Sequence, residues 1–266
     1  MSPAASFDPS KAYAQQEEVF FNDGREAQLL DHVQSRPDIE KLRGSPQKVL
    51  AAIDEFGRQE KYLMNIGEDK GAIVTRVELG GYVGYSAILF GNAARAAGAQ
   101  AYICLERSAE FARIARALID LAGLGSFVDI VVGPSSHSLR ALHASGRLER
   151  IDVLFLDHYK PAYLPDLQLC EQLGFVGRGA VIVADNVIKP GNPPYLAYVR
   201  SSVETKRRAA KAAKAAAAND HDHDHDGGGG GGVVRGNPEL VYESELIQSF
   251  EPTGIPDGVE ITICVG

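Results

Sequence analysis

The run Glu78-Leu79-Gly80-Gly81-Tyr82-Val83-Gly84 is the clearest indication of fold in this chain. It continues a short apolar segment that begins at Val77, and it precedes an amphipathic segment from Ser86 to Ala97. A strand that passes through glycines into a helix is typical of open α/β sheets, where backbone approaches a ligand at the carboxyl end of a strand. Glycines after a strand are equally compatible with a structural turn, so the rest of the chain has to decide.

Apolar and amphipathic segments alternate around this run. Apolar runs predict strands at Val77 to Gly80, Ala101 to Leu105, Phe127 to Val132, Ile151 to Leu156 and Ala180 to Ala184. Helical spacing predicts helices at Ser86 to Ala97, Ser108 to Ala122, Ser135 to Ser145 and Leu164 to Leu173, after two helices that begin near Arg25 and at Ser45-Pro46. Leu240 to Phe250 and Val259 to Val265 predict two further, antiparallel strands. The prediction is an α/β, Rossmann-like fold: a mostly parallel seven-stranded sheet with an antiparallel C-terminal pair and helices on both faces.

Composition predicts one domain with a loose N-terminal leader. The chain has 266 residues, 45% of them hydrophobic, which suits one sizeable core. Residues 1–22 are polar without clear periodicity, and residues 23–266 are expected to form the single domain. Low-complexity sequence at about 202–235 interrupts it, with an Ala- and Lys-rich run, three His-Asp pairs and six glycines, and is expected to be a disordered insertion. The His-Asp tract is either a loose metal chelator or a solvated acidic stretch.

The net charge and the positions of the cysteines indicate which partners and which cellular compartment to expect. The net charge of −8 argues against nucleic acid as the main partner. Cys104, Cys170 and Cys264 each lie in an apolar run without metal-site spacing, which predicts buried free thiols in a reducing compartment. The N-terminus does not resemble a signal peptide, and no run approaches the length of a membrane helix. We therefore expect a cytoplasmic protein that does not associate with membranes.

Glu106, at the end of the second predicted strand, points to a nucleoside cofactor. A carboxylate at this position can accept hydrogen bonds from both hydroxyls of a ribose. Two cofactors fit this pattern, a nicotinamide dinucleotide and S-adenosylmethionine (SAM). The glycine run reads E-x-G-x-x-x-G and lacks the glycines that cradle a pyrophosphate. The pattern therefore favours SAM, which has no phosphate.

Two other predicted strands end in polar residues. Asp157 follows one strand, and Asp185 and Asn186 follow another. Because parallel strands end at one edge of a sheet, these side chains converge there as three oxygen ligands suited to Mg²⁺, and equally to Mn²⁺. Lys160, three residues after Asp157, lies close enough to act as a general base. The simpler interpretations are helix caps for the carboxylates and a surface position for the lysine.

Several stretches together resemble the catechol O-methyltransferase family, in a form like those of fungi. The resemblance extends from about Phe20 to Arg200 and from about Pro238 to the end of the chain. It rests on Met64-Asn-Ile-Gly-Glu-Asp-Lys-Gly71, Glu78-Leu-Gly-Gly-Tyr-Val-Gly-Tyr-Ser86, Phe155-Leu-Asp-His-Tyr-Lys160, Tyr163-Leu-Pro-Asp166 and Ala184-Asp-Asn-Val-Ile-Lys-Pro-Gly191. It implies a class I methyltransferase fold, SAM and Mg²⁺ as cofactors, and a monomer that methylates one hydroxyl of a catechol or another vicinal diphenol.

The resemblance also implies roles for individual residues. Lys160 corresponds to the catalytic base, and Asp157, Asp185 and Asn186 correspond to the magnesium ligands. The cofactor-binding residues would be Ile66, Glu78, Gly80, Tyr82, Ser86, Glu106, Ser135, Asp157, His158 and Tyr159. The substrate-binding residues would be Tyr62, Met64, Asp157, Asn186, Pro190 and Glu251, with Glu251 on the second hydroxyl.

The chain departs from the family in two places. It has no tryptophan, and Tyr62 and Tyr159 stand where the family usually has one. Only six residues, Ala72 to Val77, separate Gly71 from Glu78, where the family has a helix and most of a strand. Six residues span about 20 Å when extended, enough for one crossing of the sheet and not for two. Either the Met64 loop moves, the helix is lost, or the sequence lacks a segment of its gene. An alternative function is therefore a SAM-binding protein with little or no activity.

Overall fold

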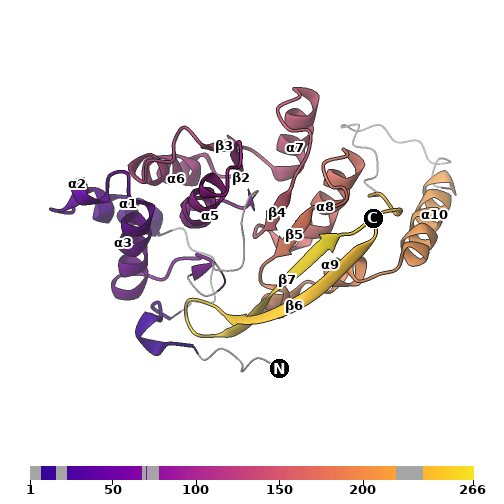
Figure 1. Cartoon of the computed structure of the whole chain (residues 1–266). Helices are drawn as coiled ribbons and strands as arrows, with labels where there is room; N and C mark the ends of the chain where they lie inside the picture. Colours follow the sequence, from indigo (N-terminus) through magenta and orange to yellow (C-terminus); the bar gives the residue numbers. More distant parts are fainter. Residues whose placement is uncertain (1–6, 16–22, 68–69, 71–77, 220–235) are drawn as a thin grey trace.

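Seven strands form one sheet in the part of the chain that is described here. The structure is a computed structural model that describes residues 7–15, 23–67, 70, 78–219 and 236–266. The strand order is β3-β2-β1-β4-β5-β7-β6 (Figure 1). The strands are β1 (Glu78–Leu79), β2 (Tyr102–Glu106), β3 (Val128–Val132), β4 (Val153–Leu156), β5 (Val181–Ala184), β6 (Tyr242–Phe250) and β7 (Pro256–Cys264).

The strand directions agree with the predicted fold. The first five strands pair in parallel, whereas β7 is antiparallel to both β5 and β6. After β1 the chain builds outward through β2 and β3, and it then returns to add β4 on the other side of β1. The boundary between β1 and β4 is therefore the point at which the winding reverses. Open α/β sheets bind their ligands beside such a point, at the carboxyl ends of the strands.

Helices cover both faces of the sheet (Figure 1). One layer holds α1 (Arg25–Gln34), α3 (Pro46–Gln59), α5 (Tyr85–Ala96) and α6 (Ala109–Leu121), with the short α2 (Ile39–Leu42) beside it. The other holds α7 (Ser135–Ala144), α8 (Tyr163–Gln172) and α9 (Pro193–Val199). Side chains alternate along the strands between two apolar cores: Cys104 and Phe155 face the first layer, and Leu105 and Leu156 face the second.

The first strand ends in a backbone arrangement that needs glycine. Gly80 has a φ of +103°, and a Cβ added there would lie 2.4 Å from the carbonyl oxygen of Asp157. A Cβ on Gly81 would lie 2.3 Å from Cys104 Sγ, and Gly84, with a φ of +89°, caps α5. The glycines therefore let the loop after β1 press against the loop after β4, which places two of the predicted site segments in contact.

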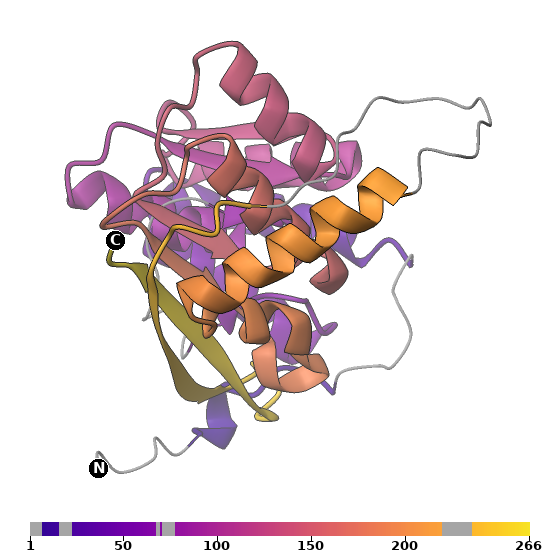
Figure 2. The same ribbon diagram turned by 90° about the vertical axis from the view of Figure 1, so that its right-hand side faces the viewer.

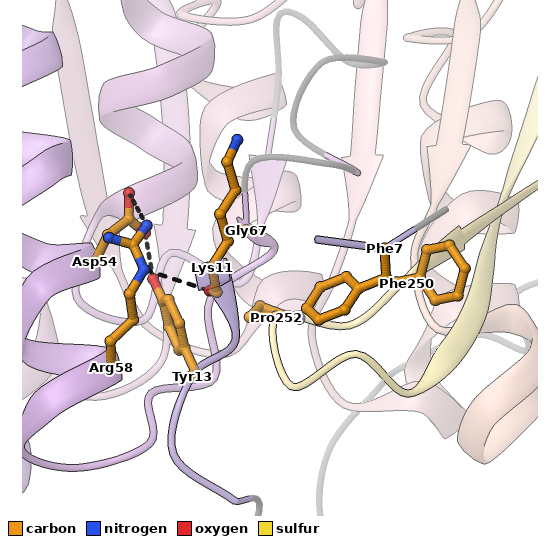
Figure 3. Close-up of a pocket in the computed structure, with 8 residues that line it drawn as sticks. All are labelled: Phe7, Lys11, Tyr13, Asp54, Arg58, Gly67, Phe250 and Pro252. Carbon is orange, nitrogen blue, oxygen red and sulfur yellow. Dashed lines mark hydrogen bonds and ion pairs between the residues drawn. The ribbon is translucent and has the colours of Figure 1, made fainter. Parts of the chain in front are cut away.

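The prediction of a loose leader is wrong for residues 7–15. Tyr13 is buried, its hydroxyl donates to the Asp54 carboxylate of α3, and its backbone N–H donates to Pro252 O at 2.8 Å. A short helix, η1 (Pro9–Lys11), precedes it. Phe7, Lys11 and Tyr13 line a small pocket against the loop after β6 (Figure 3). Contacts with α3 and with the loop after β6 thus hold a segment whose composition carries no periodic signal.

The prediction of a disordered insertion is wrong for its first half. Residues 203–219 form the helix α10 (Val203–Asn219), which runs across the α8 side of the molecule (Figure 2). The Lys206 ammonium donates to Leu240 O at 2.6 Å and lies 4.1 Å above the Tyr242 ring, so it ties α10 to the chain beyond the insertion. The His-Asp tract lies outside the described residues.

A buried carboxylate fastens both ends of the insertion to α8. Glu171 accepts hydrogen bonds from the hydroxyls of Tyr198 and Tyr242, each at 2.6 Å, and from the backbone N–H of Asn237 at 2.7 Å. These partners come from before and after the insertion. The sheet therefore continues into β6 from a point close to where the chain left α9.

Two expectations about the whole chain can be compared with the structure. All three cysteines are buried and free, as predicted. In the described part of the chain, no helix combines the length and the apolar character that crossing a membrane requires.

Substitutions at two glycines separate the cost of the positive φ from the cost of the close contact. Gly98 has a φ of +80° and nothing within 4 Å of an added Cβ, so Gly98→Ala should lower the free energy of unfolding by about 1–2 kcal/mol. Gly80→Ala adds the clash with Asp157 and should cost about 3 kcal/mol or more. Urea unfolding of both variants measures the difference. Equal losses would contradict the close approach of the two loops.

Candidate active site

The carboxyl ends of four parallel strands bring most of the predicted site residues to one edge of the sheet. Gly80 to Gly84 follow β1, Glu106 ends β2, Asp157 follows β4, and Asp185 follows β5. The antiparallel register pairs Ala184 with Glu260, so the start of β7 lies just beyond the end of β5. Glu251, which follows β6, and Asp257, near the start of β7, therefore reach the same edge.

Glu106 lies where the sequence predicted a ribose ligand. Its two carboxylate oxygens accept from the backbone N–H groups of Tyr82, at 2.8 Å, and Ser108, at 2.7 Å. Burial raises the pKa of Glu106 and these hydrogen bonds lower it, with a net rise above its ordinary value. The carboxylate is thus held at the mouth of the glycine loop. Each oxygen has a second lone pair that a ribose hydroxyl can use.

Tyr82 and Ser86 lie on the same loop and the helix that follows it. Tyr82 has a φ of +41°, and its hydroxyl donates to Glu26 of α1 at 2.8 Å. Ser86 is buried in the first turn of α5. The loop is therefore held from two sides, which gives a cofactor a fixed backbone surface. The side chain of Glu78, a further predicted cofactor residue, lies outside the described set.

A second polar cluster lies between β4 and α8, where the sequence predicted contacts to the adenine. Ser135 Oγ and His158 Nε2 both contact Asp166 Oδ2, at 2.5 and 2.9 Å. The His158 ring stacks on Tyr163, and its buried Nδ1 has no partner among the described residues. A buried ring nitrogen without a partner suits a site that a ligand completes. Tyr159, also predicted here, is 74% exposed and forms no buried wall.

Lys160, the predicted base, lies beside Asp157 after the end of β4. Its Nζ contacts Asp157 Oδ1 at 2.9 Å and the Tyr163 hydroxyl at 2.7 Å. The Tyr163 hydroxyl in turn donates to the backbone oxygen of Asp185 at 3.2 Å. Asn192 holds the backbone of Lys160 through a hydrogen bond of 2.7 Å to its carbonyl oxygen. Lys160 is thus fixed by its neighbours at the end of β4.

The ammonium of Lys70 lies within a group of three carboxylates that we call the acidic cluster: Asp185, Glu251 and Asp257. The distances from Lys70 Nζ to the three carboxylates are 2.7, 2.6 and 2.7 Å. Asn186 Nδ2 donates to Glu251 at 2.5 Å and to Asp257 at 2.9 Å. These five residues thus form one hydrogen-bonded group with the lysine at its centre.

Burial and charge act in opposite directions on this group. Burial alone would lower the pKa of Lys70, but the three carboxylates outweigh it, so the pKa is raised and the side chain is an ammonium. Burial raises the pKa of Glu251 and of Asp185. Burial also opposes the charge of Asp257, yet its contacts to Glu251 and Lys70 lower the pKa to about 2. Asp257 and Lys70 are therefore the firmly charged pair.

This arrangement does not fit the expected magnesium site. Asp157 pairs with Lys160, Asp185 pairs with Lys70, and Asn186 turns its amide N–H groups toward Glu251 and Asp257. The three predicted ligands thus each have a different partner. Within the described residues, no group of three His, Cys, Asp or Glu side chains has a geometry that could hold a metal ion.

The predicted substrate residues differ in burial. Tyr62 is buried, Met64 is half-buried and Pro190 is exposed; Ile66, which was predicted to bind the cofactor, is also buried. The buried carboxylate of Glu251 belongs to the cluster itself. Sequence reasoning missed Lys70, Asp257 and Asp166 as site residues. The turn Pro256-Asp257-Gly258 after Glu251 was a usable signal for Asp257, whereas no local pattern distinguishes Lys70 from a surface lysine.

The sequence of this chain is similar to those of known methyltransferases. The family described as "Methyltransferase domain" matches residues 77–187, which include the glycine loop, Glu106, Lys160 and Asp185. Catechol O-methyltransferase of Mus musculus is 38% identical over 188 residues, 67% of this chain and 69% of the relative. The Bos taurus enzyme is 36% identical over 194 residues, 69% of each chain. This chain belongs to the catechol O-methyltransferase family.

The fold is accordingly that of class I SAM-dependent methyltransferases. Among solved structures, the O-methyltransferase from Bacillus cereus in complex with S-adenosylhomocysteine matches with a TM-score of 0.46 and 18% identity, over 93% of each chain. Glu106 ends β2, Ser135 begins α7 after β3, and His158 follows β4; their cofactor-binding roles stay predictions.

Removing the charge of Glu106 should weaken SAM binding. A hydrogen bond from a neutral hydroxyl to a charged acceptor contributes about 1.5–3 kcal/mol, so Glu106→Gln should raise the Kd for SAM about 10- to 100-fold. Isothermal titration calorimetry measures this. Glu110→Gln is the matched control, because Glu110 is exposed in the first turn of α6, four residues away. An unchanged Kd for Glu106→Gln would contradict the ribose assignment.

Proposed function

We propose that this SAM-dependent O-methyltransferase transfers the methyl group to one hydroxyl of a catechol or another vicinal diphenol. The proposal is supported by family membership and by one observation on the site. The loop that is expected to hold the methionine part of SAM lies against Asp157, and Asp157 is hydrogen-bonded to Lys160. In the proposal, the methyl donor and the base therefore lie side by side at the point where the sheet reverses its winding.

In the proposed reaction, Lys160 removes the proton from the attacking hydroxyl. The phenolic oxygen then forms a bond to the methyl carbon as the C–S bond of SAM breaks, leaving S-adenosylhomocysteine and a methyl ether. The Asp157 carboxylate, 2.9 Å from Lys160 Nζ, stabilises the ammonium that forms. Since methyl transfer needs in-line approach, the contribution of the protein is positioning and charge stabilisation.

Mg²⁺ is not part of this proposal, because the Lys70 ammonium lies in the acidic cluster. A cytoplasmic location and a monomeric state remain predictions. The segment Ala72 to Val77, on which the alternative of a SAM-binding protein without activity depends, lies outside the described residues.

Methyl transfer from labelled SAM to catechol tests the proposal, with resorcinol as the matched compound whose hydroxyls are not vicinal. We expect methylated catechol and little product from resorcinol. Lys160→Met should lower kcat about 10²- to 10⁴-fold, as loss of a general base does. Lys48→Met, which changes an exposed lysine of α3, should leave kcat unchanged. SAM binding without turnover on any diphenol would instead establish the inactive alternative.

A further inference from the structure

The Lys70 side chain occupies the centre of the acidic cluster and is fully used there. It is 0% exposed, and its Nζ lies 2.6–2.7 Å from Asp185, Glu251 and Asp257. An ammonium group has three N–H donors, and the three carboxylates supply one acceptor for each. The lysine therefore makes the contacts that a cation in this position would make.

The cluster needs a positive charge in order to remain buried. Asp185 is 2% exposed and Asp257 is 1% exposed, and Glu251 shares both Lys70 and Asn186 with them. Like charges this close repel strongly in a medium of low dielectric constant. Removing one partner of a buried, paired group leaves an uncompensated charge at high cost. Lys70 is the cation that contacts all three carboxylates in the described structure.

A divalent cation at the same place would have to displace Lys70. Carboxylate oxygens bind Mg²⁺ at about 2.0–2.1 Å, so an ion held by Asp185 and Glu251 would lie within contact distance of the ammonium. Asn186 directs N–H groups, which repel a cation, toward Glu251 and Asp257. Occupancy by Lys70 and occupancy by a divalent ion are thus mutually exclusive.

We propose that Lys70 is the resident cation of this site and acts in place of a divalent metal ion. As a positioning residue, it holds Glu251, Asp185 and, through their shared acceptors, Asn186 in the arrangement that faces the substrate. Methyl transfer is then independent of divalent metal. The statement about turnover rests on the proposed function, whereas the statement about metal binding does not.

Titration of the wild-type chain with Mn²⁺, followed by the electron paramagnetic resonance signal of the free ion, tests the proposal directly. We expect no stoichiometric binding at millimolar Mn²⁺. We also expect the same melting temperature, and the same turnover with catechol, in EDTA and in Mg²⁺. One tightly bound Mn²⁺ per chain, or turnover that EDTA abolishes, would overturn the proposal.

Mn²⁺ affinity, measured in three variants, distinguishes the proposed role of Lys70 from a purely structural one. Lys70→Met keeps the length of the side chain and removes its charge, so it should bind Mn²⁺ about a hundredfold more tightly than the wild type, given charge interactions of several RT at this distance. Its melting temperature should rise with added Mn²⁺. Lys70→Arg keeps the charge and should remain indifferent to the metal. Lys61→Met, at an ion-paired but exposed lysine, should behave as the wild type.

The outcomes for the two proposals can be told apart. If no diphenol is methylated under any condition, the proposed function fails, and Mn²⁺ binding by the wild type and by Lys70→Arg still decides the role of Lys70. If the wild type is active only with Mg²⁺, the proposed function stands and the role of Lys70 is refuted. Should Lys70→Met fail to fold without metal but fold with Mn²⁺, the requirement for a cation at this position is supported.

Discussion

Three acidic side chains, from the ends of β5 and β6 and the start of β7, meet in the interior, where the ammonium of Lys70 compensates their charge. The fold supplies Asp185, Glu251 and Asp257 through the parallel register of β5 and the antiparallel register of β7. It then places Lys70, a residue from a distant part of the chain, among them. The polar edge of the sheet, with the predicted substrate residues around it, depends on this balance of charge because repulsion would otherwise separate the strands' ends.

Much of the fold was predictable from local pattern. Apolar runs and amphipathic segments alternate so regularly that the sheet, both helix layers and the antiparallel strand pair follow from periodicity. Glu106, Asp157 and Asp185 were also predictable as neighbours, because each comes at the end of a strand. Residues 7–15 and 203–219 were mistaken for loose and disordered segments. Their tertiary contacts, such as Tyr13 with Asp54 and Lys206 with Leu240, leave no periodic signal in the sequence.

The centre of the site was not predictable for a related reason. Asp185 and Asn186 were expected to share one metal ion, yet Asp185 pairs with Lys70 and the Asn186 amide bonds to Glu251. Two of the decisive contacts join residues more than 180 positions apart, Lys70 with Glu251 and Lys70 with Asp257. Strand-end position places a residue at an edge of the sheet. It does not say which positive charge will reach that edge, since a lysine in a polar run is indistinguishable from one on the surface.

The hydrogen bonds of Glu171 to Tyr198, Tyr242 and Asn237 allow the chain to tolerate insertions at this place, unlike at the edge of the sheet that carries the candidate site. Tyr198 and Asn237 bond to the same carboxylate, so the chain departs from the domain and rejoins it at nearly one point. Closing a loop between two fixed points becomes costlier only slowly as the loop lengthens, by about 0.6 kcal/mol for each doubling. Changes in the length of the sequence between α10 and Asn237 should therefore cost little. A second domain could be inserted at the same place, because the insertion would not alter any strand pairing.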